Sequence, residues 1–479
     1  MKTKPSVRSV WVGCVVVGAV GVGLRLIHLV GIKENPFFYH PIVDAWSYHR
    51  DALRIIESGN WIGNRIFFQA PLTSYLLALV YKLGGVNLLL PRIVQLLLGT
   101  FSAVGVFLLG RCLFGQRAAW IAGLAAAVYP LFIFFEGELL APAVTIALDV
   151  TIFLLIFYYA RERPGWRWLL PGLVFGMRAL ATTNNLATVP VFWIWLVLLA
   201  RNLSWSRRAT LRSIAIFTLG IVLAIAPVTA RNWMVQHKFV LVSSNAGLNF
   251  YLGNSGDYDH KVGMRPGPDW DEFASKHVLK GGKVGPEMSG YFFSASFKYM
   301  REHPGDYLKL LLYKTYLLLH GDEILRNQEI YAFRAYSPVL RVLLWKLPGR
   351  VGLACPFGIL LPLAVPAAFV MLRRRNLGAY LLKGYAGLYA LSVIAFFVTA
   401  RYRLPIVMPM ILLAAYGWTN FRVWWQSRLR WIVLAGMVGA YLIANTNLAP
   451  MADEMNPDAY YSLANTYYEQ GDIASAERY

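Results

Sequence analysis

Long blocks of apolar residues, separated by short loops rich in arginine and lysine, constrain this chain more than any other feature of its sequence. The blocks 10–30, 86–110, 139–159 and 214–228 each contain at most one Asp, Glu, Lys or Arg. A helix needs about 20 mostly apolar residues to cross the hydrocarbon core of a bilayer. Several blocks supply this length, and they are apolar on all sides. The pattern therefore predicts an all-α polytopic membrane protein.

Composition and charge agree with this interpretation. Hydrophobic residues make up 57% of the chain and charged residues only 15%, whereas about a quarter of a soluble protein is charged. The net charge of +21 comes from basic residues in short loops between the apolar blocks. Such loops stay in the cytosol, so we interpret the charge as a topology signal and exclude nucleic acid as a partner. The clusters are Lys2, Lys4 and Arg8; Arg111 and Arg117; Arg161, Arg163 and Arg167; Arg201, Arg207, Arg208 and Arg212; Arg373–Arg375 and Lys383; and Arg422, Arg428 and Arg430.

Placing every basic cluster in the cytosol predicts about eleven spans. The total rises to thirteen if the short apolar stretches 71–83 and 308–320 also cross, but we expect both to lie at the outer surface. The spans are expected near 10–30, 86–110, 118–135, 138–160, 167–182, 184–200, 211–230, 351–371, 378–398, 402–420 and 431–448. Two large loops, 31–85 and 231–350, and the C-terminus then face the periplasm or the cell exterior. Most acidic residues and histidines lie in these loops, so we expect the chemistry on the outer side of the cell membrane.

The first outer loop carries a recognisable order of residues. It runs from His40-Pro41 through Asp44 and Tyr48 to Gly59-Asn60-Trp61, and then enters an apolar stretch at Gln69-Ala70-Pro71-Leu72. This order resembles the first loop of the GT-C glycosyltransferases. More narrowly, it is similar to the bacterial proteins of the dolichyl-phosphate-mannose–protein mannosyltransferase type (family 39), which are relatives of the aminoarabinose lipid A transferase.

Four later stretches agree with the same family in order along the chain. They are Pro91-Arg92 with Gly110-Arg111; Ala226 to Trp233 with Ser243 to Asn249 and Leu252-Gly253-Asn254; Arg301 to Pro304 with Tyr313-Lys314; and Ala400 to Pro405. The resemblance covers residues 8–448, and it predicts that residues 1–450 form a GT-C-type transmembrane helix bundle. Two positions depart from the family pattern: Thr182 to Asn185 stand where a basic residue is usual, and Gln69-Ala70 stand where many members have a lysine. Both departures bear on which donor is bound.

The resemblance implies a reaction and a catalytic residue. Such enzymes move a sugar from a polyprenyl phosphate, undecaprenyl or dolichyl, to a protein or an envelope glycolipid, and they invert the anomeric centre. A single displacement needs one carboxylate on the acceptor side, and the phosphate leaves without an acid catalyst; soluble hydrolases, in contrast, use two carboxylates. We expect Asp44 to be that carboxylate, and we expect no cofactor and no metal ion. The other reading of Asp44 is a solvated or helix-capping side chain.

The same comparison assigns substrate-binding roles to nine residues. Fixed positive charge at headgroup level would hold the leaving phosphate, glutamates would hold a sugar hydroxyl or the acceptor, and a tyrosine would stack on a sugar. The alternatives are snorkelling of the arginines to lipid headgroups, helix-end electrostatics for the glutamates and an interfacial aromatic belt for the tyrosine. The residues are Arg92, Arg231, Arg401, Arg403, Glu136, Glu138, Tyr48, Asn232 and Asn254.

The composition changes near the end of the chain, over residues 456–479. Tyrosines and alanines lead to Gly471-Asp472 and a second short segment, which resembles the start of a tetratricopeptide repeat. A complete repeat takes about 34 residues, so we interpret the segment as incomplete, with a possible protein partner. The alternative is an amphipathic tail with no special role.

Two other functions remain open on the sequence. A transporter or flippase of lipid-linked sugars would need paired charges or broken helices deep in the membrane and inverted repeats, and the sequence shows no such repeat. A non-catalytic membrane anchor for a repeat domain is the third interpretation. The partners expected for the enzyme are the lipid donor, the protein or glycolipid acceptor and the membrane lipid itself.

Overall fold

A computed structural model gives the structure of the chain, and it describes residues 7–160, 165–264, 270, 272, 273, 275, 286–325, 329–372, 376–448 and 457–478. The basic residues Lys2, Lys4, Arg161, Arg163 and Arg373–Arg375, which are expected in the cytosol, lie outside the described residues.

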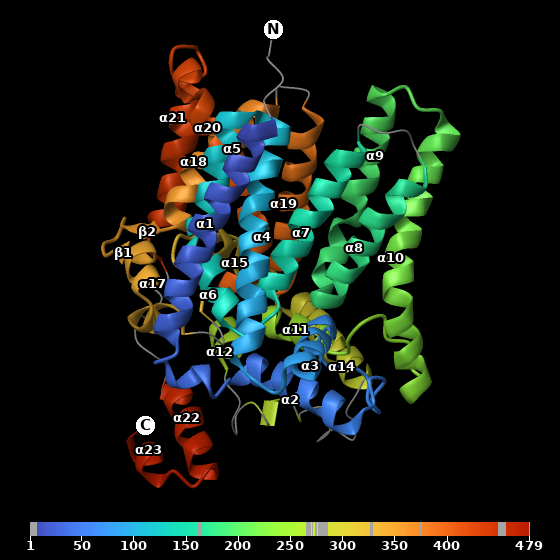
Figure 1. Ribbon diagram of the computed structural model, residues 1–479, viewed down its shortest axis with the longest axis vertical. Helices are drawn as coiled ribbons and strands as arrows, with labels where there is room; N and C mark the ends of the chain where they lie inside the picture. Colours follow the sequence, from blue (N-terminus) through green and yellow to red (C-terminus); the bar gives the residue numbers. More distant parts are fainter. Residues whose placement is uncertain are drawn as a thin grey trace.

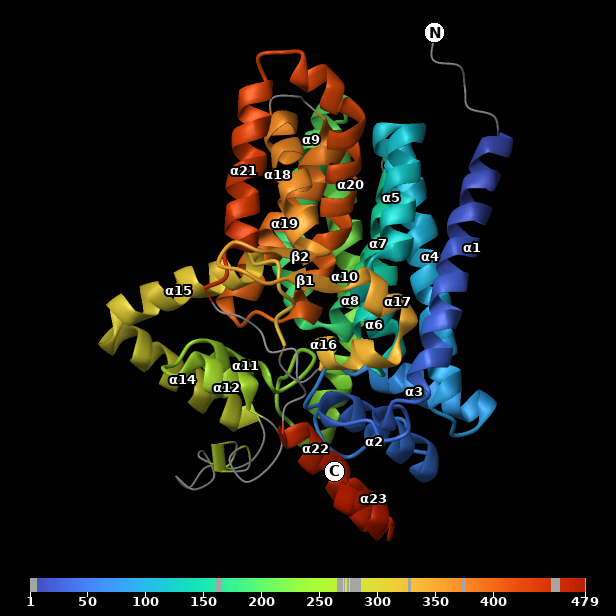
Figure 2. The same cartoon turned by 90° about the vertical axis from the view of Figure 1, so that its left-hand side faces the viewer.

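An upright bundle of long helices makes up most of the molecule (Figures 1 and 2). Seven helices of the described residues are long and apolar enough to cross a membrane, and an eighth span results if α5 and α6, which meet at 42°, are counted as one. The three remaining predicted spans coincide with α8, α18 and α21, which stand in the same bundle but are shorter. The bundle comprises α1 (Val7–Ile32), α4 (Leu89–Phe114), α5 (Gln116–Val128), α6 (Pro130–Gly137), α7 (Pro142–Tyr159), α8 (Leu169–Ala181), α9 (Val189–Asn202), α10 (Arg207–Gln236), α18 (Phe357–Leu372), α19 (Leu377–Ala395), α20 (Ala400–Trp425) and α21 (Arg430–Asn445). The protein is thus a multi-pass membrane protein.

Glycines allow two of these helices to approach closely. Gly172 and Gly176 lie one turn apart on α8, opposite Gly220 of α10. A Cβ on Gly172 would lie 2.0 Å from the carbonyl oxygen of Phe217, and one on Gly220 would lie 2.4 Å from that of Leu169. Small residues spaced in this way let helix backbones pack in a membrane, where apolar side chains gain little by leaving lipid.

Short helices cover the lower end of the bundle in Figure 1. Of the two stretches expected to remain outside the membrane, 71–83 forms α3, which packs on α2, and 308–320 forms most of α15, which leans away from the bundle in Figure 2. Neither is among the helices long and apolar enough to cross. The lower elements are η1 (Pro36–Phe38), α2 (Val43–Ser58), α3 (Leu72–Gly84), α11 (Ala246–Gly253), α12 (Tyr258–Gly263), α14 (Pro286–Glu302), α15 (Pro304–Leu319), α16 (Ile330–Phe333), η4 (Arg334–Tyr336) and α17 (Pro338–Leu343).

A few small elements complete the structure. Two short 3₁₀ helices, η2 (Trp166–Trp168) and η3 (Thr183–Thr188), lie at opposite ends of α8. Strands β1 (Trp345–Leu347) and β2 (Leu353–Cys355) form an antiparallel hairpin in which Trp345 pairs with Cys355. This hairpin lies beside the lower half of α18 and leads into that helix.

The two ends of the bundle differ in what they carry. The first turn of α1 and the loops that join α4 to α5, α9 to α10 and α20 to α21 lie at the upper end in Figures 1 and 2. The arginines of three clusters predicted to be cytosolic lie in these loops or on the adjoining helix ends: Arg111 and Arg117; Arg201, Arg207, Arg208 and Arg212; and Arg422, Arg428 and Arg430. The short helices of the two large loops lie at the lower end. The basic loops and the large loops are therefore at opposite ends, as the topology requires.

The C-terminal segment forms a helical hairpin, α22 (Pro457–Glu469) and α23 (Ile473–Arg478), at the lower end. Its turn places Gly471 at φ +78°, a conformation that glycine adopts without strain. The ring of Tyr467 packs against His40 of the first large loop, with 4.9 Å between ring centroids. The expected helix, Gly-Asp turn and second helix are present, and the assignment to a repeat stays a prediction.

Candidate active site

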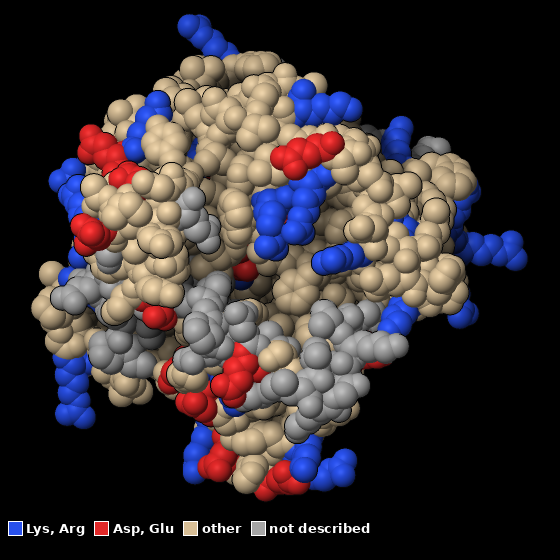
Figure 3. All heavy atoms as spheres, turned by 90° about the horizontal axis from the view of Figure 1, so that it is seen from below, with Lys and Arg blue, Asp and Glu red and all other residues tan. Residues whose placement is uncertain are grey.

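A cavity of about 430 Å³ lies at the lower end of the bundle, where segments distant in the sequence meet. Seen from below, the surface is hollowed near its centre (Figure 3). A small-molecule site typically encloses about 300–1,000 Å³ and combines apolar walls with a few polar groups. The walls come from α2, the segment before α3, the end of α8 with η3, the start of α11, the end of α19 and the start of α20. The lining residues are Val43, Asp44, Ser47, Tyr48, Phe68, Gln69, Ala70, Ala181, Thr182, Thr183, Asn184, Ala187, Ser243, Asn245, Ala246, Leu248, Asn249, Met264, Trp270, Ser392, Val393, Phe396, Phe397, Arg401 and Tyr402.

Asp44 and Arg401 form an ion pair in the wall of this cavity. The Oδ2 of Asp44 lies 2.6 Å from Nη1 of Arg401, and the two side chains are 17% and 14% exposed. Gln69 donates from Nε2 to the other carboxylate oxygen, Oδ1, at 2.8 Å. Asp44 lies in the first turn of α2, where the partial positive charge of the helix N-terminus also favours a carboxylate. The carboxylate is thus held in one orientation from several sides.

The backbone just before Asp44 is strained. Val43 has φ +53°, a region that a β-branched residue rarely enters because its side chain collides with the backbone. Such strain costs on the order of 1–3 kcal/mol, and it clusters at binding and catalytic sites. The fold accepts this cost at the residue that begins α2 and lines the cavity, next to the predicted catalytic carboxylate.

Tyr48 lies one turn after Asp44 on the same helix and also faces the cavity. Burial raises the pKa of the Tyr48 phenol far above its usual value, and the nearby Asp44 carboxylate acts in the same direction. The hydroxyl therefore stays protonated across the physiological range and can donate a hydrogen bond. Of the ten residues that we predicted for the site, Asp44, Tyr48 and Arg401 line the cavity.

Three of the other predicted residues are buried in internal contacts away from the cavity. Arg92 donates to the carbonyl oxygens of Gly137 and Leu88 and lies over the ring of Phe38. Glu136 accepts from the guanidinium of Arg25 on both carboxylate oxygens. Arg403 donates to Oε2 of Glu323 and to the carbonyl oxygen of His320. These contacts hold helix ends together, and the structure does not bring the three residues to the cavity.

Asn232, Asn254 and Arg231 also serve the framework of the large loops. Asn232 is fully buried and donates to the carbonyls of Val240 and Val242, so it fixes the turn after α10. Asn254 accepts from Lys314 at 2.9 Å. Arg231 lies over the ring of Phe67, 3.9 Å from its centroid, in the segment that leads to Gln69.

Glu138 completes the predicted set and also lies away from the cavity. It follows α6 at the bend before α7 and is partly exposed. Arg92 is its main charged neighbour.

Some residues that stabilise the structure around the cavity or within the bundle were not among the ten predicted from the sequence for the site. Lys314 is fully buried and donates to the carbonyls of Gly253 and Phe396, which ties α15 to the loops beside the cavity. Burial lowers the pKa of its amine to about 7. Arg25, within the first apolar block, could have been singled out as a charge at membrane depth, because such residues are usually paired or functional.

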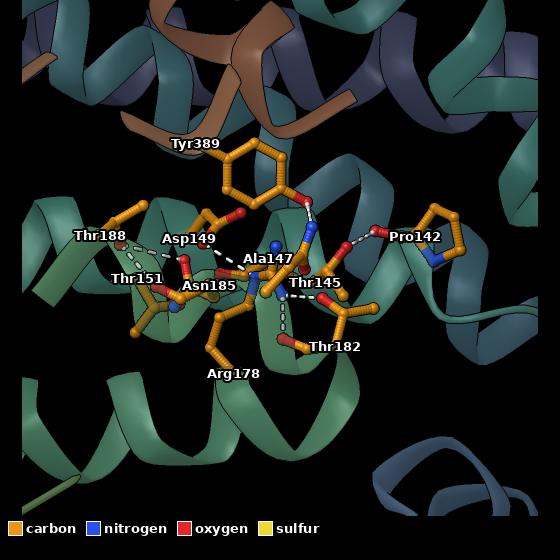
Figure 4. Close-up of polar contacts among 11 residues, drawn as sticks. Pro142, Thr145, Ala147, Asp149, Thr151, Arg178, Thr182, Asn185, Thr188 and Tyr389 are labelled. Carbon is orange, nitrogen blue, oxygen red and sulfur yellow. Dashed lines mark hydrogen bonds and ion pairs between the residues drawn. The ribbon is translucent and has the colours of Figure 1, made fainter. Parts of the chain in front are cut away.

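A buried ion pair supports one wall of the cavity (Figure 4). Nε of Arg178 on α8 lies 3.0 Å from Oδ1 of Asp149 on α7. The same guanidinium donates to the hydroxyl and the carbonyl of Thr182, at the point where α8 ends. Asn184 follows in η3 and donates from Nδ2 to the hydroxyl of Tyr389 on α19 at 3.2 Å. The wall from Thr182 to Asn184 is therefore held by three helices.

Within the described residues, no three His, Cys, Asp or Glu side chains gather in an arrangement that could hold a metal ion. The expectation that no metal is required stays a prediction.

Known proteins resemble this chain in sequence and in fold. The family model of the dolichyl-phosphate-mannose–protein mannosyltransferases matches residues 69–233, about a third of the chain. The structure of ArnT from Cupriavidus metallidurans bound to undecaprenyl phosphate is similar over 97% of this chain and 74% of its own, with a TM-score of 0.50 and 13% identity. The chain has the GT-C fold. No curated protein matches the sequence.

A second solved structure agrees with this fold. The archaeal oligosaccharyltransferase AglB from Archaeoglobus fulgidus, in complex with an inhibitory peptide and a dolichol-phosphate, is similar over 97% of this chain with a TM-score of 0.51 and 14% identity. This chain spans about three fifths of the length of AglB. The predicted fold class, a GT-C-type bundle of transmembrane helices with large loops, is thus confirmed.

Proposed function

We propose that the protein is a membrane glycosyltransferase that moves a sugar from a polyprenyl phosphate to a protein or an envelope glycolipid. The observation that carries the proposal is the Asp44–Arg401 pair in the wall of a cavity at one end of a GT-C-type bundle. The comparisons support it, because ArnT was captured with undecaprenyl phosphate and AglB with a dolichol-phosphate and a peptide.

Asp44 is the group that acts on the acceptor. Its carboxylate accepts from Arg401 and Gln69, and an acceptor hydroxyl or amide in the cavity would donate to it in turn. As the acceptor oxygen or nitrogen forms a bond to the anomeric carbon, positive charge develops on that atom and its proton becomes acidic. A carboxylate at this position stabilises the charge and takes the proton, a contribution that is typically 10²–10⁴-fold. One carboxylate is enough for a single displacement with inversion.

Arg401 is the group that acts on the leaving phosphate. Among the described residues that line the cavity it is the one cation. While Nη1 faces Asp44, the guanidinium carries further N–H donors in a rigid plane, and Nη2 lies 3.4 Å from the hydroxyl of Tyr402. As the glycosidic C–O bond breaks, the electrons pass to the phosphate oxygen, and a fixed guanidinium stabilises that charge. One ion pair thus links the acceptor to the leaving group.

The orientation of the site is the second part of the proposal. The cavity lies at the end of the bundle opposite the arginine-rich loops. Because such loops stay in the cytosol, the cavity and the C-terminal hairpin would face the periplasm or the cell exterior. Cysteine labelling tests this placement in a background where Cys14, Cys112 and Cys355 are replaced by serine. Trp46→Cys on α2 should react with an impermeant reagent added outside intact cells, and Arg208→Cys at the start of α10 should not. The opposite pattern would refute the orientation.

A transporter of lipid-linked sugars is the second candidate, because the described residues include a bent helix pair and three buried ion pairs, Arg25–Glu136, Asp149–Arg178 and Glu323–Arg403. These charges are paired within the protein, however, and none of the six residues lines the cavity. Transfer and transport are separated by one assay. Purified protein in nanodiscs, given polyprenyl-phosphate sugar and an envelope extract, should label proteins or glycolipids, which mass spectrometry detects. A transporter would label nothing, because it moves the lipid-linked sugar intact and forms no glycosidic bond to an acceptor.

A further inference from the structure

The short connection between α19 and α20, residues 396–399, joins two parts of the cavity wall. Phe396 and Phe397 belong to this α19–α20 turn, and Arg401 and Tyr402 follow it in the first turn of α20. All four line the cavity. The position of the Arg401 guanidinium therefore depends on the path of the backbone through the α19–α20 turn.

Lys314 of α15 binds this turn through its ammonium group. Its Nζ donates to the carbonyl oxygen of Phe396 at 3.1 Å, to that of Gly253 at 2.9 Å and to Oδ1 of Asn254 at 2.9 Å. The side chain is fully buried. Because an ammonium has three N–H donors, these three neutral oxygens occupy all of them. Lys314 thus joins α15 and the end of α11 to the turn.

The end of α11 lies against the same turn. A Cβ on Gly253 would collide with the carbonyl oxygen of Phe396, so the two backbones touch at this point. Asn254 adds a second link, because its Nδ2 donates to the carbonyl oxygen of Ala395 at 2.7 Å. The oxygen of the same Asn254 amide accepts from Lys314. The ammonium therefore lies where three segments of the chain converge.

Further hydrogen bonds hold the rest of the connection. The hydroxyl of Tyr258 on α12 accepts from the backbone N–H of Val398 at 3.1 Å. The backbone N–H of Ala400 donates to the carbonyl oxygen of Ile324 at 2.9 Å. The backbone that leads into Arg401 is thus held at successive points by the second large loop, and in these contacts the charged donor is Lys314.

A cation at this position is costly to the fold. Burial of an ammonium without a carboxylate partner is unfavourable, and it lowers the pKa of Lys314 to about 7. Methionine would fill a similar space without this penalty, but it could donate to none of the three oxygens. Hydrogen bonds from an ionised donor are roughly twice as strong as neutral ones. The charge therefore gives a firm hold on the turn at a cost in stability.

We infer that Lys314 is a positioning residue for the proposed transfer reaction: it fixes the α19–α20 turn and so holds the Arg401 guanidinium toward the leaving phosphate. The inference rests on the proposed function and deepens it, because it gives the second large loop a part in the chemistry. Lys314 does not itself line the cavity, so it acts through Arg401.

The test compares sugar transfer by the wild type and by Lys314→Met in nanodiscs. A small displacement of a catalytic group can slow a reaction by up to about 100-fold, so we expect kcat to fall about 10- to 100-fold. Because Arg401 faces the donor phosphate, the KM for the lipid donor should rise about threefold or more, and the KM for the acceptor should stay within about twofold. A variant that had only lost folded protein would show a lower kcat with both KM values unchanged, and that result would overturn the inference.

Trp195→Phe is the matched control. Trp195 is also buried, and its Nε1 donates to the carbonyl oxygen of Leu377 at the other end of α19. The change removes a hydrogen bond to the same helix and leaves the turn intact, so the variant should keep at least half of the wild-type rate. Thermal unfolding of each preparation shows whether the variant is folded.

Tyr258→Phe tests the same turn with a milder change. It removes the hydroxyl that accepts from Val398 and keeps the ring, so it decides the question even where Lys314→Met does not fold. We expect kcat to fall about threefold or more, together with a higher KM for the lipid donor. Wild-type values of both constants for folded Tyr258→Phe would count against control of Arg401 by the turn.

A double-mutant cycle locates the effect at Arg401. Independent effects multiply, whereas effects that pass through one group do not. Addition of Lys314→Met to Arg401→Ala should therefore slow transfer by less than about threefold, although Lys314→Met alone slows it at least about tenfold.

Two further results overturn the inference while the proposed function stands: a wild-type rate for folded Lys314→Met, or a full multiplicative loss when Lys314→Met is added to Arg401→Ala. The proposed function fails separately, if the wild-type protein transfers sugar from no polyprenyl-phosphate donor to any acceptor.

Discussion

Replacement of Asp44 by asparagine is the most informative single change. Asparagine keeps the size of the side chain and an oxygen that can accept from Gln69, but it removes the charge that faces Arg401. With exposures of 17% and 14%, this pair lies between exposed pairs, whose net contribution is about 0–1 kcal/mol, and buried pairs, whose disruption costs about 3–5 kcal/mol. We therefore expect Asp44→Asn to lower the free energy of unfolding by roughly 1–3 kcal/mol.

The effect on transfer should be larger. Loss of a positioned base lowers the rate about 10²–10⁴-fold, which corresponds to about 3–5 kcal/mol at 1.36 kcal/mol per tenfold change. The assay follows sugar transfer from a polyprenyl-phosphate donor in nanodiscs, with thermal unfolding of the same preparations to confirm that the variant is folded.

Asp51 provides the control for this experiment. It lies seven residues further along α2, is 48% exposed, and is 3.6 Å from Arg54 at the surface. Asp51→Asn should retain the wild-type rate. The reasoning is refuted if folded Asp44→Asn keeps more than half of the wild-type rate, or if Asp51→Asn loses as much as Asp44→Asn.

Three further predictions concern the framework. Arg25→Gln or Glu136→Gln should lower the melting temperature sharply, because each variant leaves a buried charge unpaired at a cost of about 3–5 kcal/mol. Replacing both residues by methionine should recover much of this loss. Equal melting temperatures for all three variants would contradict the prediction. Burial lowers the pKa of Lys314 from 10.5 to about 7. Between these pH values the unfolded chain binds more protons than the folded protein, so the free energy of unfolding should rise with pH, by up to about 1.4 kcal/mol per pH unit. Denaturation curves measured from pH 7 to 10.5 should lack this rise for Lys314→Met. Val43→Gly should raise the free energy of unfolding by about 1–2 kcal/mol, because glycine adopts the positive φ of this position without strain. The same change should slow sugar transfer, because the backbone before Asp44 becomes more flexible. An unchanged melting temperature would argue against strain at Val43.

The membrane architecture followed from the sequence because its cause is local. A span must be apolar over its own length, and its loops must carry the right charge, whatever the neighbouring helices are. The blocks that contain Arg25 and Asp149 remained recognisable as helices despite the charge within each. The ordered motifs also predicted the GT-C fold, which the comparisons confirm.

Only the tertiary structure decided which side chains meet. Asp44 and Arg401 were both predicted, but their direct pairing was not. The charged residues Arg92, Glu136 and Arg403 were expected at the substrate, yet each is satisfied inside the protein. Helical periodicity tells which face of a helix a side chain occupies, whereas the identity of the helix opposite that face depends on how the whole bundle packs. The same limit explains the cavity: Gln69 and Asn184, which belong to the two departures from the family pattern, both line it, because the segment before α3 and η3 meet at the same end of the bundle.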